Sequence, residues 1–305
     1  MRKTFSDTVE KIALRDPKVL FITGDLGFNA FENLQKGIGE RFINGGVAEQ
    51  NMVGMAAGLA HKGYKVFCYS IAPFITYRCL EQIRIDVCFH KLPVFIVGNG
   101  GGYGYGIMGA THHAIEDIAC MSSLPGMTCY IPSFIEDVSK SLEEMVSNQK
   151  PAYLRLGLGK PNPISLEKLE PINIIYAQKD AEITIVALGP VINNVLNAIN
   201  DAELKNKVDL FSLVKLPATN FEDSDLLKSL QTTGKLLIVE EHIARGGIAE
   251  YISLKLISNN VILNKFKSLH AMGYPNELYG DQNYHQVQSG LDSKAIQKTI
   301  YELIN

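Results

Sequence analysis

The stretch Val19-Leu20-Phe21-Ile22-Thr23-Gly24-Asp25 decides the fold class, because a short apolar run ends there at a glycine and an acidic residue. Three similar apolar runs follow, at residues 66–69, 94–97 and 153–156, with segments of helical periodicity between them. Strands that alternate with helices predict a parallel sheet with helices on both faces. In an open sheet of this kind, ligands bind outside the carboxyl ends of the strands, which is where Asp25 stands.

The second half of the chain repeats this alternation after a break. At residues 157–178 the pattern gives way to Gly-Leu-Gly-Lys-Pro-Asn-Pro and a mixture of Lys, Glu and Pro, which marks a domain boundary. Strands are then predicted at residues 183–189, 209–214, 236–240 and 266–272, and a helix at 293–304. A chain of 305 residues is long enough for two cores. We therefore predict two α/β modules, a parallel-sheet domain at residues 1–165 and a smaller domain at 176–305.

Composition excludes several classes of protein. The net charge of −3 and the 20% of charged residues lack the basic character of a nucleic-acid-binding protein. No apolar run reaches the length of a signal-peptide core or a membrane span. The five cysteines form no C-x-x-C pair, which favours free thiols in a reducing compartment. We predict a cytoplasmic protein that binds neither nucleic acid nor membranes.

A carboxylate stands at the start of a helix rich in small residues. Residues 44–52 are Asn-Gly-Gly-Val-Ala-Glu-Gln-Asn-Met, and Gly-Met-Ala-Ala-Gly-Leu-Ala follows at 54–60. Small residues allow another helix to approach closely, so this helix fits either a subunit interface or an internal helix pair. Glu49 alone fits a simple helix-capping role, because the helix dipole favours an acid in the first turn.

The order and spacing of four segments change that interpretation. Residues 44–52 are followed by an aromatic and arginine segment at 69–84, by Gly-Ala-Thr-His-His…Glu-Asp within 106–119, and by Val-Glu-Glu-His…Gly-Gly within 239–249. Together they resemble the group formed by transketolase, deoxyxylulose-phosphate synthase and the pyruvate dehydrogenase beta subunit. The resemblance covers essentially the whole chain, but only the pyrimidine-binding and C-terminal domains of a full-length transketolase.

The resemblance implies thiamine diphosphate as cofactor and a role for each matched residue. Glu49 corresponds to the glutamate that hydrogen-bonds N1′ of the aminopyrimidine, Phe74 to the aromatic ring that stacks on it, and Arg78 to the arginine beside it. A proton held between the glutamate and N1′ favours the imino tautomer, whose 4′-nitrogen can take the proton from thiazolium C2. His112 corresponds to the histidine that contacts the carbonyl and hydroxyl end of the substrate. Asp25 corresponds to a cofactor-side acid, and a turn-forming aspartate is the alternative.

Two other kinds of site can be weighed against this one. The loop at residues 98–106 runs into a formal G-x-G-x-x-G match, but no acidic residue follows where a dinucleotide ribose would need one, so we interpret it as a flexible active-site loop. His112, His113 and Glu116 lie on one short stretch without a fourth ligand, which makes a poor zinc motif. We predict no metal site within this chain. The segments 239–249 and 279–281 are expected to be structural or interfacial, because the C-terminal domain of relatives does no chemistry.

The missing motifs predict a partner. The sequence contains no Gly-Asp-Gly followed by Asn-Asn, the family motif for magnesium and diphosphate, so an N-terminal subunit is expected to hold both. Pairing as a heterodimer or a dimer of heterodimers is the natural expectation.

The substrate is less well defined by the sequence. Met108, Leu158 and Gly100 replace family residues that contact sugar hydroxyls and phosphate, so the substrate differs from the standard pentose phosphates, or Lys160 or the partner supplies those contacts. The predicted activity is transfer of a two-carbon ketol unit between small sugars. A decarboxylating thiamine enzyme subunit and a non-catalytic scaffold are the alternatives.

Overall fold

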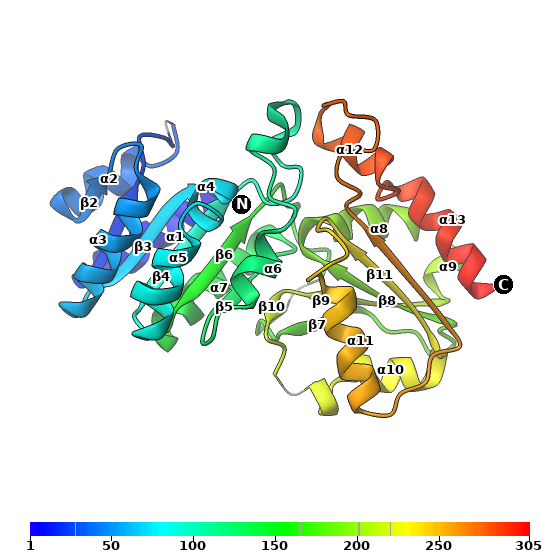
Figure 1. Cartoon of the computed structure of the whole chain (residues 1–305). Helices are drawn as coiled ribbons and strands as arrows, with labels where there is room; N and C mark the ends of the chain where they lie inside the picture. Colours follow the sequence, from blue (N-terminus) through cyan, green and yellow to red (C-terminus); the bar gives the residue numbers. More distant parts are fainter. Residues whose placement is uncertain (28, 165, 201, 220) are drawn as a thin grey trace.

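The computed structural model describes residues 1–27, 29–164, 166–200, 202–219 and 221–305. The chain forms two α/β modules that lie side by side, each with a sheet between two layers of helices (Figure 1). The predicted fold class is therefore confirmed. Ser165, the predicted last residue of the first domain, lies outside the described residues, and the predicted domain limits stay a prediction.

The first module contains a seven-stranded sheet in the order β10-β5-β6-β4-β3-β1-β2. Its parallel strands are β1 (Val19–Thr23), β2 (Phe42–Asn44), β3 (Lys65–Ile71), β4 (Val94–Asn99), β5 (Thr128–Tyr130) and β6 (Ala152–Leu156). The four strands predicted in this half are β1, β3, β4 and β6. The sequence did not predict β2 and β5, because three residues are too few to set a pattern.

Successive side chains of each strand point to opposite faces, so two separate layers cover this sheet. On one face α1 (Arg2–Arg15), α2 (Glu32–Ile38) and α7 (Ile135–Asn148) bury an aromatic cluster that includes Phe5, Phe21 and Tyr69. On the other face lie α3 (Glu49–His61), α4 (Ala72–Thr76), α5 (Leu80–Gln82), the π-helix η2 (Ile83–Phe89) and α6 (Asp117–Ser122). Two short 3-10 helices, η1 (Gly39–Arg41) and η3 (Gly106–Thr111), lie in loops.

The second module contains a five-stranded sheet in the order β12-β11-β8-β9-β7. Its strands are β7 (Ile172–Tyr176), β8 (Ile183–Leu188), β9 (Val208–Leu213), β11 (Lys235–Glu240) and β12 (Lys265–His270). On one face of this sheet lie the helices α8 (Ile192–Ala198), α9 (Ala202–Lys205) and α13 (Ser293–Ile304). On the other face lie α10 (Asp225–Thr233) and α11 (Ile248–Ser258), and α12 (Gln282–Gln288) lies at one end. Two 3-10 turns, η4 (Gly189–Val191) and η5 (Phe221–Asp223), complete the module. Strands β8, β9, β11 and β12 and helix α13 lie where they were predicted. Strand β7 was missed, because it lies inside the stretch that the sequence marks as a boundary and pairs antiparallel with β9 at the sheet edge.

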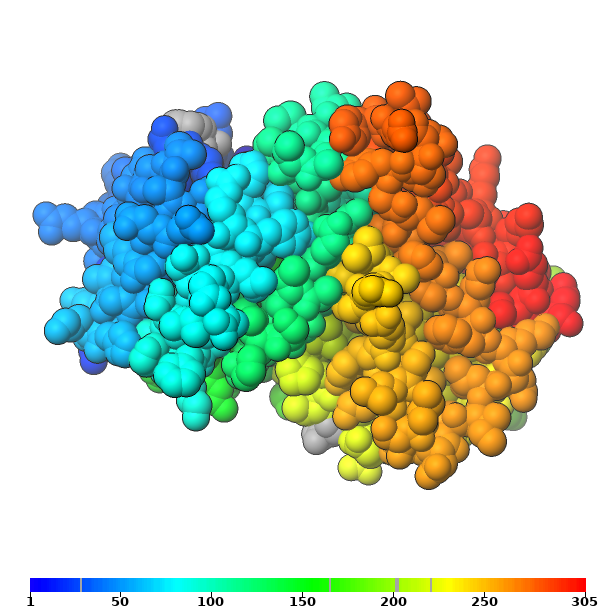
Figure 2. Space-filling model, in the orientation of Figure 1, coloured from blue at the N-terminus to red at the C-terminus, as the bar shows by residue number. Residues whose placement is uncertain are grey.

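The two modules are joined by more than a linker. Strand β10 (Lys215–Leu216) leaves the second module and pairs antiparallel with β5 of the first sheet. The hydrophobic core that lies under α3 continues without a break into the layer under α10 and α11. The space-filling view shows the two halves in contact over a broad front (Figure 2). In the described parts of the chain, no helix has both the length and the hydrophobicity needed to span a bilayer.

We expect Phe5→Ala to lower the free energy of unfolding by about 3–5 kcal/mol, because it leaves a cavity in the aromatic cluster under α1. Phe5 is fully buried, with 0% of its surface exposed. Urea unfolding followed by circular dichroism measures the change. Leu14→Ala is the matched control on the same helix, since Leu14 is 59% exposed and its truncation should cost less than about 0.5 kcal/mol. Equal losses in the two variants would contradict the packing described here.

Candidate active site

The carboxylate of Glu49 is buried at the first residue of α3, with 3% of its surface exposed. Its Oε1 accepts a hydrogen bond from the Ser70 hydroxyl at 3.0 Å, and its Oε2 accepts one from Nη1 of Arg78 at 3.0 Å. The Arg78 side chain is 47% exposed, so the ion pair joins a buried acid to a base that reaches the solvent. A buried carboxylate needs such partners, because removal of a charge from water is costly.

The loop before α3 explains why the acid lies there. Gly46 has a positive φ of 72°, and a Cβ atom on Gly45 would lie 2.5 Å from Cγ of Met52. Asn44 accepts a hydrogen bond from the Gly46 amide through its side-chain oxygen at 2.9 Å. These glycines allow the chain to turn tightly from the end of β2 into the helix, which brings Glu49 to the carboxyl edge of the sheet.

Three more predicted residues join Glu49 in a chain of contacts. The Arg78 guanidinium lies 4.3 Å from the centre of the Phe74 ring, which is a cation–π distance. The Phe74 ring meets the His112 imidazole edge-on, with ring centres 5.0 Å apart. The structure therefore brings Glu49, Arg78, Phe74 and His112 together from α3, α4 with the turn after it, and the loop after η3.

The His112 imidazole is held on one side and open on the other. Its Nδ1 is 2.8 Å from the Thr111 hydroxyl, and its ring lies 5.6 Å from that of Tyr105. In the part of the chain that the structure describes, Nε2 of His112 has no hydrogen-bond partner. That nitrogen is free to meet a ligand.

Asp25 lies beside this cluster and not in it. Its side chain is exposed, its Oδ1 accepts a hydrogen bond from Asn44 at 3.3 Å, and its backbone amide donates to the Gly46 carbonyl at 3.2 Å. Among the described residues, no contact joins Asp25 directly to Glu49, Phe74 or His112. Its observed contacts hold the glycine turn before α3, and its cofactor role stays a prediction.

A cavity of about 380 Å³ opens next to Tyr105. Its lining includes Gly100 and Leu158, two positions where the sequence lacks expected phosphate contacts, together with Arg2 and Lys3 from the start of α1. Lys3 pairs with Asp7 at 2.9 Å, whereas no ion pair involves Arg2 among the described residues, and the Arg2 side chain hydrogen-bonds the Tyr69 hydroxyl. Sequence reasoning missed Arg2, because a basic residue at a helix start looks like an ordinary surface charge. A larger cavity of about 840 Å³ lies around Phe89, before β4, β5 and β6, and so at the opposite edge of the sheet.

His113 faces away from His112, into the junction of the two modules. Its Nε2 lies 2.7 Å from the Gly106 carbonyl and its Nδ1 lies 2.8 Å from the Tyr274 hydroxyl. A carbonyl can only accept, so Nε2 carries the proton and Nδ1 accepts from the tyrosine. Burial lowers the pKa of His113 to about 4, which keeps the ring neutral. The structure gives this residue a structural role, and no metal-binding group of three His, Cys, Asp or Glu side chains occurs among the described residues.

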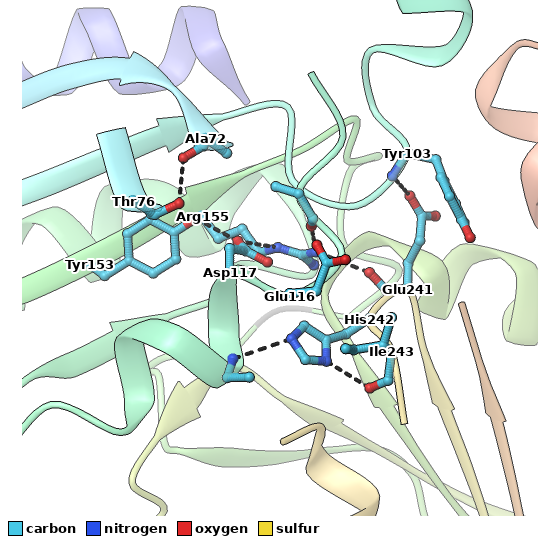
Figure 3. Close-up of polar contacts among 12 residues, drawn as sticks. Ala72, Thr76, Tyr103, Glu116, Asp117, Tyr153, Arg155, Glu241, His242 and Ile243 are labelled. Carbon is cyan, nitrogen blue, oxygen red and sulfur yellow. Dashed lines mark hydrogen bonds and ion pairs between the residues drawn. The ribbon is translucent and has the colours of Figure 1, made fainter. Parts of the chain in front are cut away.

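A buried ion pair lies at the centre of the junction (Figure 3). Nε of Arg155 donates to Oδ2 of Asp117 at 2.9 Å, and the Tyr153 hydroxyl donates to the same oxygen at 2.5 Å. Nη2 of Arg155 also donates to the Ala114 carbonyl at 2.8 Å and to the Glu241 carbonyl at 3.0 Å. One guanidinium group therefore binds α6, the loop that follows His113, and the end of β11 in the second module.

The second module also holds the glycine-rich loop through Glu241. Its Oε1 accepts a hydrogen bond from the Tyr103 amide at 2.6 Å (Figure 3), and its Oε2 accepts one from Gln286 at 2.5 Å. The Tyr103 ring stacks on His285 with ring centres 4.8 Å apart. His242 accepts from the Ala119 amide at 3.2 Å. These contacts agree with the structural role predicted for residues 239–249.

Comparison with known proteins identifies the family. The descriptions "Transketolase, pyrimidine binding domain" and "Transketolase, C-terminal domain" match residues 1–160 and 173–296. The chain belongs to the transketolase family. The resemblance inferred from the sequence is thus confirmed, including its place as a C-terminal transketolase subunit, and the family is one of thiamine-diphosphate-dependent enzymes.

Two relatives of this transketolase chain are matched over nearly their whole length. The apulose-4-phosphate transketolase subunit of Phocaeicola vulgatus is 30% identical, over 99% of this chain and 97% of the relative. The putative transketolase C-terminal section of Methanocaldococcus jannaschii is 31% identical, over 99% of this chain and 95% of the relative. By contrast, 1-deoxy-D-xylulose-5-phosphate synthase of Clostridium perfringens is 28% identical, and this chain spans 49% of its length.

Solved structures agree with the family assignment. The structure described as "Split gene transketolase, inactive beta4 tetramer" superposes with a TM-score of 0.83 at 26% identity, covering 99% of this chain and 97% of that one. Transketolase of Leishmania mexicana shares the fold with a TM-score of 0.77 at 17% identity, and this chain corresponds to 45% of it.

We expect Arg155→Met to lower the free energy of unfolding by about 3–5 kcal/mol, because it leaves the buried Asp117 charge without its partner. Asp117 is 0% exposed and Arg155 is 4% exposed. Arg84→Met is the control, since that arginine is 52% exposed and solvent screens its pair with Glu81, so its loss should change stability little. Chemical denaturation of the three proteins tests this, and a neutral Arg155→Met would show that the junction does not depend on the pair.

We expect His113 to make the chain less stable as pH falls. Its folded pKa of about 4 lies below the ordinary value of 6.5, so the unfolded chain binds more protons between these pH values and stability is lost as pH drops through that window. The loss is on the order of 1–3 kcal/mol. His113→Gln keeps a donor for Gly106 and an acceptor for Tyr274 and should flatten the dependence. Urea unfolding at several pH values between 4 and 6.5 measures this loss of stability, with His61→Gln, at an exposed position, as control. If stability depended on pH in the same way in His113→Gln as in the unaltered chain, His113 would not be the group responsible.

Proposed function

We propose that this chain is the aminopyrimidine-holding subunit of a two-chain transketolase that transfers a two-carbon ketol unit between sugar phosphates. One observation carries the proposal. The buried Glu49 carboxylate, the Arg78–Phe74 pair and His112 form one continuous group at the carboxyl edge of the sheet.

The residues present fit an aminopyrimidine. Glu49 offers a carboxylate that is buried and hydrogen-bonded by Ser70, and Phe74 offers an aromatic ring that is only partly buried. A flat heteroaromatic ring with a basic nitrogen matches both groups, because aromatic rings stack and a carboxyl group can share a proton with such a nitrogen. When bound, thiamine diphosphate supplies a carbanion equivalent that attacks a ketose carbonyl. Glu49 would hold the proton at N1′, and Phe74 would fix the plane of the pyrimidine with Arg78 beside it.

His112 would act on the substrate. Because Thr111 fixes its Nδ1 side, the free Nε2 can hydrogen-bond a substrate oxygen and stabilise the charge that develops there. Asp25 would act from the cofactor side through the glycine turn that it holds before Glu49.

A partner chain is part of the proposal. With no Gly-Asp-Gly…Asn-Asn motif, magnesium and the diphosphate would be held mainly by an N-terminal subunit, in a heterodimer or a dimer of heterodimers. A relative matched over 97% of its length is named as a transketolase subunit, and a matching structure is named "Split gene transketolase"; both names support a two-chain enzyme. Cytoplasmic location is part of the proposal, and it is supported by five free cysteines.

Sugar phosphates are the proposed substrates. Two relatives carry sugar phosphates in their names, and the cavity beside Gly100 and Leu158 presents the Arg2 cation in place of the phosphate contacts that those two positions lack. A guanidinium group suits a phosphate because it offers several donors in a fixed plane. Decarboxylative condensation is the second candidate, favoured by the likeness to 1-deoxy-D-xylulose-5-phosphate synthase. Release of carbon dioxide from a 2-oxoacid donor distinguishes it from ketol transfer.

We expect thiamine diphosphate with magnesium to bind tightly only when this chain is mixed with its N-terminal subunit, because each chain holds half of the cofactor. Calorimetry on the chain alone and on the mixture measures this. Glu49→Gln should lower the ketol-transfer rate by roughly 100-fold or more, since the proton at N1′ is no longer shared with a carboxylate. Glu302→Gln, an exposed change on α13, is the matched control. No cofactor binding in the mixture would exclude the catalytic role and leave a scaffold subunit.

A further inference from the structure

Tyr105 occupies the place where a side chain at position 100 would lie. A Cβ atom on Gly100 would be 2.2 Å from Cε2 of Tyr105, and Gly100 has a positive φ of 77°. Position 100 therefore favours glycine, both because its backbone would strain another residue and because the tyrosine ring fills the adjacent space. The side chain that fills this space therefore comes from Tyr105, five residues further along the loop.

The Tyr105 hydroxyl group is a hydrogen-bond donor whose proton is not used within the described residues. Its oxygen accepts a hydrogen bond from Nδ2 of Asn99 at 2.8 Å, and an amide nitrogen can only donate. The phenol proton is therefore not used in that bond, and no acceptor for it is found among the described residues. Burial raises the pKa of Tyr105, and the smaller effects of Asn99 and Arg2 oppose that rise without cancelling it. The hydroxyl stays protonated at neutral pH.

The surroundings of Tyr105 indicate what it faces. It lines the cavity of about 380 Å³ together with Arg2 and Leu158, and its ring lies 5.6 Å from the His112 ring. A ligand with an oxygen at His112 and an anionic group in this cavity would lie against Tyr105, which is close to both. The cavity thus combines a cation and a neutral donor, which is a suitable pair for a phosphate group.

We propose that Tyr105 is a substrate-binding residue that donates its phenol hydrogen bond to the phosphate group of a sugar phosphate, next to Arg2. This inference rests on the proposed ketol-transfer function and adds to it a residue that sets the preference for phosphorylated substrates. Selectivity for the phosphate would then depend on a neutral donor as well as on the Arg2 cation.

The test compares matched acceptors with and without phosphate in the assembled enzyme. Tyr105→Phe should raise KM for D-glyceraldehyde 3-phosphate roughly 10-fold to 100-fold, as expected when a hydrogen bond to a charged group is removed, and should leave KM for D-glyceraldehyde unchanged. Binding of thiamine diphosphate should not change. Arg2→Gln should show the same selective effect, and Tyr301→Phe, an exposed tyrosine on α13, is the matched control.

Each outcome separates the two proposals. An unchanged KM for the phosphorylated acceptor in Tyr105→Phe, or an equal rise for both acceptors, overturns the role of Tyr105 while ketol transfer by the unaltered enzyme stands. If that enzyme transfers no ketol unit, titration of inorganic phosphate into this chain, followed by 31P NMR, still tests whether Tyr105 and Arg2 bind phosphate. Weaker phosphate binding in both Tyr105→Phe and Arg2→Gln than in Tyr301→Phe supports the site, and identical binding in all of them overturns it.

Discussion

The guanidinium group of Arg155 is the constraint on which the arrangement of the two modules depends. It neutralises the buried Asp117 and also binds main-chain carbonyls on either side of the junction, at Ala114 and Glu241. A buried arginine is tolerated only when its donors are satisfied, and here the donors are satisfied by both modules together. The position of one module relative to the other is therefore set by the geometry of a planar ion with fixed donor directions.

The junction also fixes the loop that carries His112, because that loop is held at both of its ends. Its first turn is tied to Glu241 through the Tyr103 amide, and its last turn is tied to Tyr274 through His113. The second module has no residue in the group around Glu49, yet its contacts help to fix the position of His112. The two adjacent histidines differ in their surroundings: Nε2 of His112 has no hydrogen-bond partner among the described residues, whereas both ring nitrogens of His113 are hydrogen-bonded in the junction.

The sequence predicted the parts of the fold that have a repeating pattern. Strands β1, β3, β4, β6, β8, β9, β11 and β12 and helix α13 were predicted, and the order of the motifs predicted that Glu49, Phe74, Arg78 and His112 would meet. Strands of two or three residues, such as β2, β5 and β10, have no period to detect, and their pairing depends on distant neighbours. Arg2 and Tyr105 were missed for a related reason. Each looks ordinary alone, and only the folded chain brings them to one cavity with Gly100 and Leu158.

Strand β10 has a consequence for how this protein could have evolved and how it could be recombined. Although the chain looks like two interchangeable cassettes, residues 215–216 of the second supply the last strand of the first sheet, beside β5. A chimera joined between the cassettes would have to inherit a compatible crossing strand, or it would expose an unpaired sheet edge and invite aggregation. The unit that can be exchanged without harm is therefore the pair of modules together, because they share both a sheet and a hydrophobic core.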